Sequence, residues 1–347
     1  MAHSRYSFLE KQTILITGGT GSFGQKLVEI LLQETRAEAI RIYSRDELKQ
    51  LQMSHRYPDP RLRFLVGDVR DRERLYRAMR GVDCVIHAAA LKQVPTCEYN
   101  PLEAVKTNIL GAAHVMDASI DCGVKKVVAL SSDKAVSPVN LYGATKLCAE
   151  KLFVQGNSYS GTDGARFSCV RYGNVVASRG SVIPIFLQHR SNGTIPVTDK
   201  RMTRFWITVE QGVRFVLHCL EAMRGGEVFI PRIPSMNIMD LVEAVAPGCR
   251  VTLTGIRPGE KLHEVLISSD EARQTLEFPE MFVLQPVHAW WNTDHLPGGT
   301  PLPDDFIYSS STNPQRLTID ALRTMVAQLD SGTGQADEPR FEKTVHG

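Results

Sequence analysis

The stretch "TILITGGTGSFG", from Thr13 to Gly24, joins an apolar run to a turn that is rich in glycine. The residues up to Gly18 are typical of a buried strand, and those after Gly21 are typical of the first turn of a helix. A tight turn requires the first glycine, close approach of a pyrophosphate to the backbone requires the second, and close packing of helix on strand requires Gly24. The stretch therefore predicts a dinucleotide-binding loop, with a purely structural turn as the alternative.

The first half of the chain continues this alternation of strand and helix. Five further apolar runs are predicted as strands: Ala39 to Ser44, Leu62 to Asp68, Asp83 to Ala89, Lys125 to Ser132 and Arg166 to Val175. They lack alternating polar residues, which is typical of strands covered on both faces. Strands separated by helices imply right-handed crossovers, so we predict an α/β fold with a Rossmann-type doubly wound parallel sheet.

The pattern becomes less regular after Val176, where we predict a change of domain. Residues 1–175 form the predicted dinucleotide-binding Rossmann domain. Residues 176–330 form a smaller C-terminal α/β domain for substrate binding, some segments of which can return to the sheet. In this second part we expect a helix near Thr208 to Met223 and short strands around Val228 and Val251. Residues 331–347 are polar and are expected to be a disordered tail.

The composition favours a globular protein with a small partner. Of the 347 residues 43% are hydrophobic and 22% are charged, and the formal net charge of +2 arises from interspersed acids and bases. No run of Lys and Arg marks a nucleic-acid or membrane surface. No apolar h-region precedes the first strand, and no stretch reaches the roughly 18 apolar residues of a membrane span. We therefore expect a cytoplasmic protein that binds neither nucleic acid nor membrane.

Cysteine and histidine occur without the spacing of a cross-linked or metal-bound site. The seven cysteines are widely spread and form no CxxC pair, so we expect buried free thiols rather than disulfides. The ten histidines show no HExxH or comparable spacing, so no metal is expected.

The end of the second predicted strand indicates which dinucleotide is bound. An NAD-binding protein often has an acid there for the ribose 2′-hydroxyl, whereas this chain has Ser44 and Arg45. A hydroxyl and a guanidinium suit a 2′-phosphate, so we predict NADP. Asp46 leaves NAD as the alternative, in which Arg45 is a solvated loop residue. The other predicted cofactor contacts are Thr20, Ser22 and Phe23 in the glycine-rich loop, Asp68 and Val69 after the third strand, and Ala88, Ala89 and Ala90 after the fourth.

A second stretch, "SSDKAVSPVNLYGATK" from Ser131 to Lys146, gathers ionisable residues that a core does not need. Tyr142 and Lys146 are spaced i and i+4, so they share one face of a helix. An ammonium beside a phenol favours the phenolate, so we expect Lys146 to lower the pKa of Tyr142. Tyr142 could then take a proton from a substrate hydroxyl beside the nicotinamide, and both residues are predicted to be catalytic and to contact the cofactor. The alternative is that Tyr142 is a structural residue of the helix, whose ring only packs against its neighbours.

This YxxxK pair, which follows a strand ending in two serines, resembles the short-chain dehydrogenase/reductase superfamily in its extended form. Simple epimerases of this superfamily carry small or apolar residues after the strand-end serine or threonine. The sugar-nucleotide dehydratases carry an acid and a second catalytic residue there, because elimination of water needs one proton removed and another supplied. Retaining dehydratases usually have Asp-Glu at that point, whereas this chain has Asp133 and Lys134.

That substitution occurs together with longer motifs: "GGTGSFG", "SRDE", "GDVRD", "HAAALKQVP", "EYNPLEAVKTN", "RYGNVVASRGSVIPIF", "MTRFWIT" and "RPGEKLHEVLI". From about Gln12 to Leu322 the chain resembles the inverting UDP-N-acetylglucosamine 4,6-dehydratases (5-epimerising) that begin pseudaminic acid synthesis. Ser132 replaces the more usual threonine of that family, and both residues supply a hydroxyl.

The resemblance implies a lyase that uses NADP and forms UDP-2-acetamido-2,6-dideoxy-β-L-arabino-hexos-4-ulose. Tyr142, aided by Lys146, would deprotonate the sugar 4-hydroxyl. Lys134 would remove the C5 proton and Asp133 would protonate the departing 6-hydroxyl, with Ser132 as a further catalytic residue. Lys134 can act as a base only when neutral, so we expect burial near the nicotinamide ring to lower its pKa. The alternative for Lys134 is a salt bridge with Asp133.

The resemblance also implies contacts to the substrate, UDP-N-acetylglucosamine. The predicted substrate-binding residues are Lys92, Asn174, Arg179, Ser181, Arg257, Glu260 and Lys261. It further implies a homo-oligomer, from dimer to hexamer, with interface or core candidates at Leu147, Leu152, Phe153 and Val154. Two other functions stay open: a UDP-hexose 4-epimerase, in which Asp133 and Lys134 would have no role, and a nonenzymatic NADP-binding protein.

Overall fold

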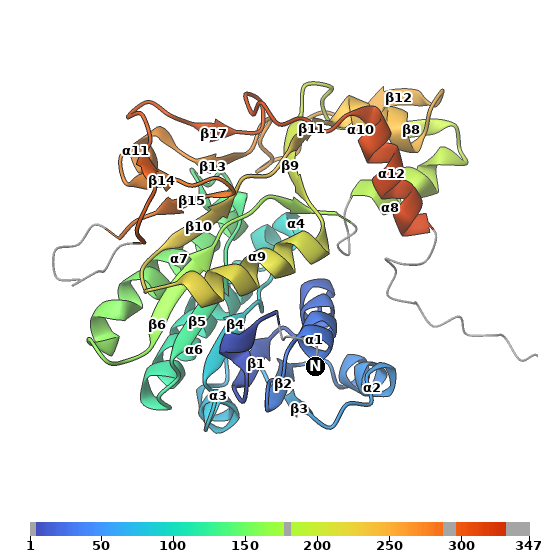
Figure 1. The fold of residues 1–347 in the computed structure, drawn as a ribbon. Coiled ribbons are helices and arrows are strands. Elements are labelled where there is room, and N and C mark those ends of the chain that lie inside the picture. Colours follow the sequence, from blue (N-terminus) through green and yellow to red (C-terminus); the bar gives the residue numbers. More distant parts are fainter. Residues whose placement is uncertain (1–4, 177–181, 287–295, 331–347) are drawn as a thin grey trace, which may run out of the picture.

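A ten-stranded sheet runs through the computed structural model, which describes residues 5–176, 182–286 and 296–330 (Figure 1). Its strand order is β16-β14-β15-β10-β6-β5-β4-β1-β2-β3. The bounds are β1 Thr13–Thr17, β2 Ala39–Ser44, β3 Leu62–Val66, β4 Cys84–His87, β5 Lys126–Leu130, β6 Arg166–Val170, β10 Val228–Pro231, β14 Thr275–Glu277, β15 Met281–Leu284 and β16 Thr300–Pro301. The first six strands and β10 are parallel, and β14, β15 and β16 are antiparallel to their neighbours.

The order 3-2-1-4-5-6 of the first six strands confirms the predicted doubly wound sheet. Its strands are covered on both faces, and all five residues of β1 are buried. On one face α1 (Ser22–Glu34) packs against α9 (Val209–Ala222), and on the other α6 (Gly111–Asp121) lies between α3 (Arg72–Met79) and α7 (Leu141–Ser160) (Figure 1). The loops after the parallel strands therefore meet at one edge of the sheet, where ligands bind in this class of fold.

Shorter helices complete the first half of the chain. They are η1 Ser7–Leu9, α2 Glu47–Arg56, α4 Val94–Tyr99, α5 Pro101–Val105, the π-helical turn η2 Lys106–Leu110 and the 3-10 turn η3 Asp133–Ala135. The turn η3 lies directly between β5 and α7, at the carboxyl edge of the sheet.

The sixth predicted strand is wrong in its second half. β6 ends at Val170, and β7 (Asn174–Val175) pairs instead with β9 (Thr203–Ile207) in a separate three-stranded sheet that includes β11 (Ser235–Asn237). The predicted run is interrupted by Arg171, Gly173 and Asn174, and the chain leaves the large sheet at Arg171, whose buried guanidinium is held by two carboxylates. The strand therefore ends at a residue whose ionic contacts are with distant segments.

The C-terminal half returns to the large sheet, as the sequence allowed. β10 pairs in parallel with β6, and β15, β14 and β16 extend the sheet beyond it. The helix expected near Thr208 to Met223 is present as α9, with a capping box formed by Thr208 and Gln211. A division of the chain at Val176 would therefore leave four strands of the large sheet in its second part.

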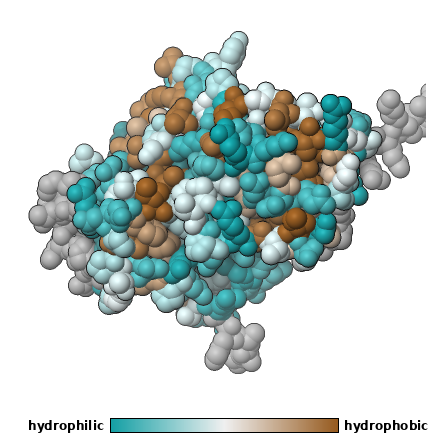
Figure 2. Space-filling model, turned by 90° about the horizontal axis from the view of Figure 1, so that it is seen from above, coloured by the Kyte–Doolittle hydropathy of each residue, from teal (hydrophilic) through white to brown (hydrophobic). Residues whose placement is uncertain are grey.

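The rest of this half forms a smaller unit above the carboxyl edge (Figure 1). Its elements are α8 Val182–Arg190, β8 Thr194–Val197, α10 Ile238–Val245, β12 Arg250–Leu253, β13 Val265–Ile267, α11 Ser269–Ala272, β17 Tyr308–Ser309 and α12 Ile319–Asp330. A second hydrophobic cluster, with Ile195, Trp206 and Leu241, forms the core of the part with α8, β8, α10, β12 and α12. Leu266 and Ile267 of β13 and Tyr308 of β17 belong instead to the main core. Seen from above in Figure 2, the face of the molecule is largely hydrophilic, with separate hydrophobic patches.

The cysteines are free, but they are not all buried. Cys84, Cys97, Cys169 and Cys219 are buried, whereas Cys148 on α7 is exposed. Within the described ranges no three or more His, Cys, Asp and Glu side chains gather as a metal site would require. None of the described helices is long and apolar enough to cross a membrane.

Candidate active site

The glycine-rich loop lies against the loop that follows β4. Gly18 has a φ of +69°, and a Cβ there would lie 2.9 Å from the Cα of Ala89. The Gly18 amide donates to the Tyr43 carbonyl at 2.8 Å, which ties the turn to β2. Gly21 is the N-cap of α1 and has no side chain to bond the first-turn N–H groups. The turn thus offers a bare helix N-terminus beside the Ala88 to Ala90 segment, as a pyrophosphate would require.

The end of β2 presents Ser44 and Arg45 near this turn. The Ser44 hydroxyl is buried and accepts a hydrogen bond from Gln50 at 3.0 Å. The Arg45 side chain is 56% exposed, and its Nη1 lies 3.6 Å from Oδ2 of Asp68. Asp46 already caps α2 through the Lys49 amide and pairs with Lys49 Nζ at 2.6 Å. Arg45 is therefore freer to meet a ligand than Asp46.

Asp68 and Val69 follow β3 at the same edge. Burial alone would raise the pKa of Asp68, but hydrogen bonds from Arg70 and the charges of Arg70 and Arg45 leave it below its ordinary value. Val69 is buried, and its carbonyl oxygen lies 3.3 Å from Nδ1 of His114. The predicted cofactor residues after β1, β2, β3 and β4 thus all lie on adjacent loops of the carboxyl edge.

Glycine at position 143 brings the start of α7 against η3. A Cβ on Gly143 would collide with the carbonyl oxygen of Lys134. Asn140 caps α7 by accepting from the Gly143 amide at 2.7 Å, and its Nδ2 donates to the Gly259 carbonyl at 2.7 Å. This packing places Tyr142 beside Asp133 and Lys134, and it attaches the site to the loop that contains Arg257 and Lys261.

Tyr142 does not have the lowered pKa that its spacing from Lys146 predicted, and that expectation is wrong. Burial raises the pKa of Tyr142 to about 12, although the charge of Lys134 and a hydrogen bond with Ser132 act in the opposite direction. Lys146 is buried, its Nζ donates to the Leu130 carbonyl oxygen at 2.5 Å, and burial lowers its pKa. The cation that acts on the phenol is therefore Lys134.

Asp133, Lys134, Arg204 and Glu264 form an ionic group, named here the Lys134 cluster. Nζ of Lys134 lies 3.0 Å from Oδ2 of Asp133 and 3.3 Å from Oε1 of Glu264. The same Nζ donates to Oδ1 of Asn174 at 3.4 Å. Asp133 is 0% exposed, Glu264 is 3% exposed, and Oδ1 of Asp133 accepts from the Ser132 hydroxyl at 2.8 Å. Three of the predicted catalytic residues thus share one hydrogen-bonded network.

The two carboxyl groups of the Lys134 cluster have pKa values shifted in opposite directions. Burial raises the pKa of Asp133, and the charge of Glu264 raises it further. Burial alone would also raise the pKa of Glu264, but the charges of Lys134, Arg204 and Lys261 hold it below its ordinary value. Of the two carboxyl groups, Asp133 therefore has the greater tendency to accept a proton, which suits the role of acid.

The expectation of a lowered pKa for Lys134 is also wrong. Burial alone would lower the pKa of Lys134, but the charges of Asp133 and Glu264 outweigh it and raise the value. The alternative reading, a salt bridge with Asp133, is confirmed, and Glu264 is a second partner. Lys134 becomes a base only when its proton moves to a neighbour, and Asp133 is within hydrogen-bond distance to receive it.

The predicted substrate residues lie in several places. Asn174 contacts Lys134, and Nζ of Lys261 donates to the Val136 carbonyl at 2.5 Å. Oε2 of Glu260 accepts from the backbone amide of Arg257, an exposed residue, at 3.4 Å. Lys92 is exposed on the loop after β4. Arg179 and Ser181 lie outside the described residues.

Sequence reasoning missed three residues that organise the site. Glu264 and Arg204 lie in the quoted motifs "RPGEKLHEVLI" and "MTRFWIT", but nothing local indicates that they reach Lys134. Asn108, in the π-helical turn η2, bonds both the amide and the carbonyl of Leu91 and donates to Oγ1 of Thr145 at 2.9 Å. Asn108 therefore holds the loop after β4 against α7, and π-helical turns are frequent at functional sites.

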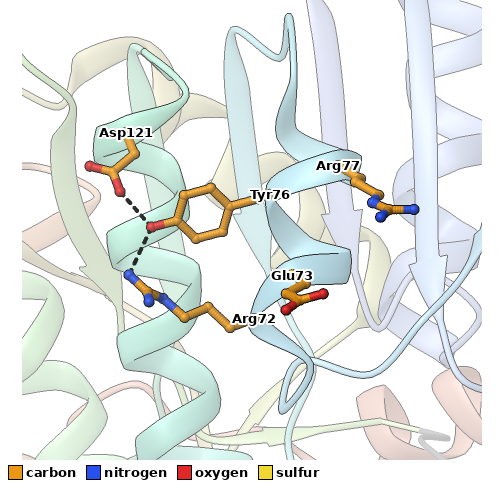
Figure 3. A pocket seen from close by; sticks show the side chains of 5 residues that line it. All are labelled: Arg72, Glu73, Tyr76, Arg77 and Asp121. Atoms are coloured by element: carbon orange, nitrogen blue, oxygen red, sulfur yellow. Dashed lines mark hydrogen bonds between the residues drawn. The ribbon is translucent and has the colours of Figure 1, made fainter.

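A separate hollow opens between α3 and α6, in the layer of helices on one face of the sheet (Figure 3). The Tyr76 hydroxyl donates to Asp121 and accepts from Arg72, so the polar groups there pair with one another. Asp121 ends α6 just before β5 begins, whereas η3 follows the end of β5. This hollow is therefore not part of the site at the carboxyl edge.

Comparisons with known proteins show the family to which the chain belongs. Residues 14–286 match the family model described as polysaccharide biosynthesis protein. The UDP-N-acetylglucosamine 4,6-dehydratase (inverting) of Campylobacter jejuni subsp. jejuni is 53% identical over 88% of this chain and 94% of its own length. A UDP-glucose 4-epimerase of Rickettsia akari is 44% identical over 76% of this chain and 80% of its own. The structure of Pen from Bacillus thuringiensis is 36% identical with a TM-score of 0.84, over 92% of this chain and 99% of that one.

Proposed function

We propose that this chain, which belongs to the polysaccharide biosynthesis protein family, is a hydro-lyase that converts UDP-N-acetylglucosamine into the 4-keto-6-deoxy sugar with inversion at C5. The observation that carries the proposal is the Asp133–Lys134 contact of 3.0 Å beside Tyr142, at the carboxyl edge of a Rossmann sheet. Loss of water requires one proton removed and one supplied, and this pair can do both. The product would serve a pathway such as pseudaminic acid synthesis.

The chain's own residues fit a nicotinamide dinucleotide, with NADP preferred. Gly18 leaves room that a Cβ would fill, and the bare start of α1 suits a pyrophosphate. Ser44 and Arg45 would hold the 2′-phosphate, because Asp46 is engaged in capping α2. When bound, NADP would accept a hydride from C4 of the sugar and return it to C6.

Tyr142 would take the proton of the sugar 4-hydroxyl. Because its pKa is high, the phenol must lose its proton more easily to act as a base at neutral pH. Two groups on the chain lower its pKa: the Lys134 charge and the Ser132 hydroxyl. Ser132 also donates to Asp133, so it links the base for the 4-hydroxyl to the acid for the 6-hydroxyl. Lys146 would contribute by fixing the start of α7 through Leu130 and by meeting the cofactor.

Asp133 and Lys134 would perform the elimination. Moving one proton from Nζ of Lys134 to Oδ2 of Asp133 turns the ion pair into a neutral pair without changing its total charge. That single transfer produces both the base for the C5 proton and the acid for the 6-hydroxyl. Lys134 then takes the C5 proton, the C6–O bond breaks, and Asp133 protonates the departing oxygen as water. A proton returned to the other face of C5 inverts that centre.

The substrate nucleotide would lie under the smaller C-terminal unit, residues 176–330. Arg257 and Lys261 are cations on the loop bonded to Asn140, so they support a diphosphate site beside the start of α7. Asn174, Arg179, Ser181, Glu260 and Lys92 complete the proposed substrate contacts. A homo-oligomer remains part of the proposal; Phe153 belongs to the core, whereas Leu147, Leu152 and Val154 are only partly buried. Light scattering at micromolar concentration tests it, and a monomeric mass contradicts it.

Proton NMR of UDP-N-acetylglucosamine incubated with the protein and NADP in D₂O tests the reaction. The expected product has a new C6 methyl signal, deuterium at C5 and the L-arabino configuration. A product with the original configuration at C5 would overturn the inverting assignment. Retention of the 6-hydroxyl with a changed C4 centre would instead show a 4-epimerase, the activity named for the Rickettsia relative.

A further inference from the structure

We infer that Glu264 is a positioning residue of the elimination step: its Oε1, 3.3 Å from Nζ of Lys134, fixes the lysine between two carboxylates and reserves the mobile proton for Asp133. The inference rests on the proposed function and deepens it, because it concerns how the base and the acid of that reaction acquire their protonation states. Glu264 lies within the motif "RPGEKLHEVLI", in which Arg257, Glu260 and Lys261 were predicted to bind the substrate.

Two distant segments hold Glu264 in place. Its amide donates to the Ser310 hydroxyl at 2.9 Å, and its carbonyl accepts from the Ser310 amide at 2.8 Å. The Ser310 hydroxyl in turn lies 2.7 Å from Oγ1 of Thr203 on β9. The backbone of Glu264 is therefore bonded to the chain just after β17 and linked to β9. This fixed backbone directs the carboxylate at Lys134 with little freedom to move away.

The charges around Glu264 keep it ionised. Lys134 faces Glu264 from η3. Arg204, on β9, has its Nε 3.8 Å from Oε1 of Glu264, and the charge of Lys261 acts from the preceding loop. Asp133 is the neighbouring anion, and the segment after β17 contributes the neutral hydroxyls of Ser309 and Ser310. The imidazole of His263, the adjacent residue, contacts Thr203. With three cations nearby, Glu264 is a poor acceptor for the proton of Lys134.

One oxygen of Glu264 indicates that this carboxylate is not kept for stability. Oε2 is buried and has no hydrogen-bond partner among the described residues. A buried carboxylate that served only to stabilise the fold would be expected to have both oxygens satisfied. Lys134 contacts two carboxylates. Because Glu264 stays ionised, only Asp133 can take the proton of Lys134 and act as the acid.

The pH dependence of kcat in Glu264→Gln is the test. The active pair holds one mobile proton, so the rate falls when the pair gains a second proton at low pH or loses its last one at high pH. Removing the negative charge of Glu264 makes both protons easier to lose, so the acidic and the basic limb of the pH–rate profile both move to lower pH. We also expect kcat at the wild-type optimum to fall on the order of 10²-fold, as misplacement of a catalytic group does.

Glu264→Asp is the second variant, since it keeps the charge. Its limbs should stay near the wild-type positions, with a smaller loss of kcat. Limbs of Glu264→Gln that coincide with those of the wild type would overturn the inference. So would Glu264→Asp with limbs displaced as far as those of Glu264→Gln, because that result would make shape rather than charge the cause. Glu271→Gln, at a partly buried glutamate that also pairs with an arginine, is the matched control and should leave both limbs in place.

A readout without turnover separates this inference from the proposed function. In protein labelled with ¹³C at lysine Cε, the Lys134 signal is identified by its absence from Lys134→Ala. Its titration should move to lower pH in Glu264→Gln and not in Glu271→Gln. If the wild type forms no product but the Lys134 titration moves as expected, the reaction assignment fails and the Glu264 contact stands. If product forms and the titration does not move, the inference fails alone.

Discussion

Two buried ionic clusters lie near each other in this molecule, and they differ in how fully they are paired. The Arg171 cluster consists of Glu150 on α7, Arg171 after β6 and Glu271 on α11. Every N–H of Arg171 has an acceptor: both oxygens of each glutamate lie within 3.2 Å of it, and the Leu266 carbonyl accepts at 2.9 Å. In the Lys134 cluster, by contrast, the nearest cation–carboxylate contacts are 3.0 and 3.3 Å, and one oxygen of Glu264 has no hydrogen-bond partner in the part of the chain that the structure describes.

The difference in pairing corresponds to a difference in task. The Arg171 guanidinium cannot lose its proton, so its cluster can only hold α7, β6 and the C-terminal half together. The Lys134 ammonium can lose its proton, and the carboxyl beside it has a raised pKa. A saturated cluster built on arginine is thus suited to holding segments, and an unsaturated cluster built on lysine is suited to moving a proton. Mutations that remove one member of each cluster should separate stability from activity.

Removing the lysine should have the largest effect. Lys134→Ala should lower the rate of product formation by about 10² to 10⁴, because the base for C5 is lost. The reduced form of the cofactor should still accumulate on the enzyme, but more slowly than in the wild type, because Tyr142 keeps the hydrogen bond with Ser132 and loses the Lys134 charge that lowers its pKa. Absorbance of the reduced nicotinamide and NMR of the product measure the two steps. Lys126→Ala, at a half-buried lysine bonded to the Leu220 and Glu221 carbonyls, is the control and should keep its rate. An undiminished rate in Lys134→Ala would contradict the assignment.

Arg171→Met should act on stability instead. Removal of a buried cation leaves two uncompensated carboxylates, so we expect the free energy of unfolding to fall by about 3 to 5 kcal/mol. Denaturant unfolding measures the loss, and the molecules that remain folded should still form product. Replacing all three members of the Arg171 cluster by apolar residues of similar size should recover much of the stability. Loss of product formation in fully folded Arg171→Met would show that the two clusters are not separate in function.

The Arg171 cluster should also make stability sensitive to acid. Burial alone would raise the pKa of Glu271, but Arg171 holds it below its ordinary value. The contribution of Glu271 to stability is therefore complete above the unfolded-state pKa, about 4.3 for glutamate, and is lost as the pH falls through the lower folded-state value. Denaturant unfolding at a series of acidic pH values should show a shallower dependence in Glu271→Gln than in the wild type. Equal slopes would mean that other groups govern acid unfolding.

An exposed ion pair completes the contrast and should show the smallest effect. Arg45 and Asp68 lie 3.6 Å apart with the arginine more than half exposed, so Arg45→Ala should change stability by no more than about 1 kcal/mol. It should weaken NADP binding by about tenfold while leaving NAD binding nearly unchanged, because the lost guanidinium would contact only the 2′-phosphate, which NAD lacks. Titration calorimetry with both dinucleotides measures this. Equal weakening of both would show that Arg45 does not read the phosphate.

Much of the fold could be predicted because its determinants are local. The six parallel strands follow from apolar runs, and the turn at Gly18 follows from a glycine that adopts a positive φ of +69°. The predicted strand through Arg171 is wrong because Asn174 and Val175 pair with β9 instead, and the local sequence does not indicate the partner of so short a strand. The antiparallel strands β14, β15 and β16 have too few residues for a periodic pattern to indicate where they pair.

The sequence by itself determined which residues stand next to one another at the site: Ser132, Asp133 and Lys134 after β5, and Tyr142 with Lys146 one helical turn apart. Only the tertiary structure decided their charges. Lys134 meets Glu264, which is 130 positions later in the chain, and the charge of Lys134 rather than that of Lys146 acts on Tyr142. The physical reason is that a pKa depends on burial and on the distance to other charges, and both are fixed by packing between segments that no local pattern relates.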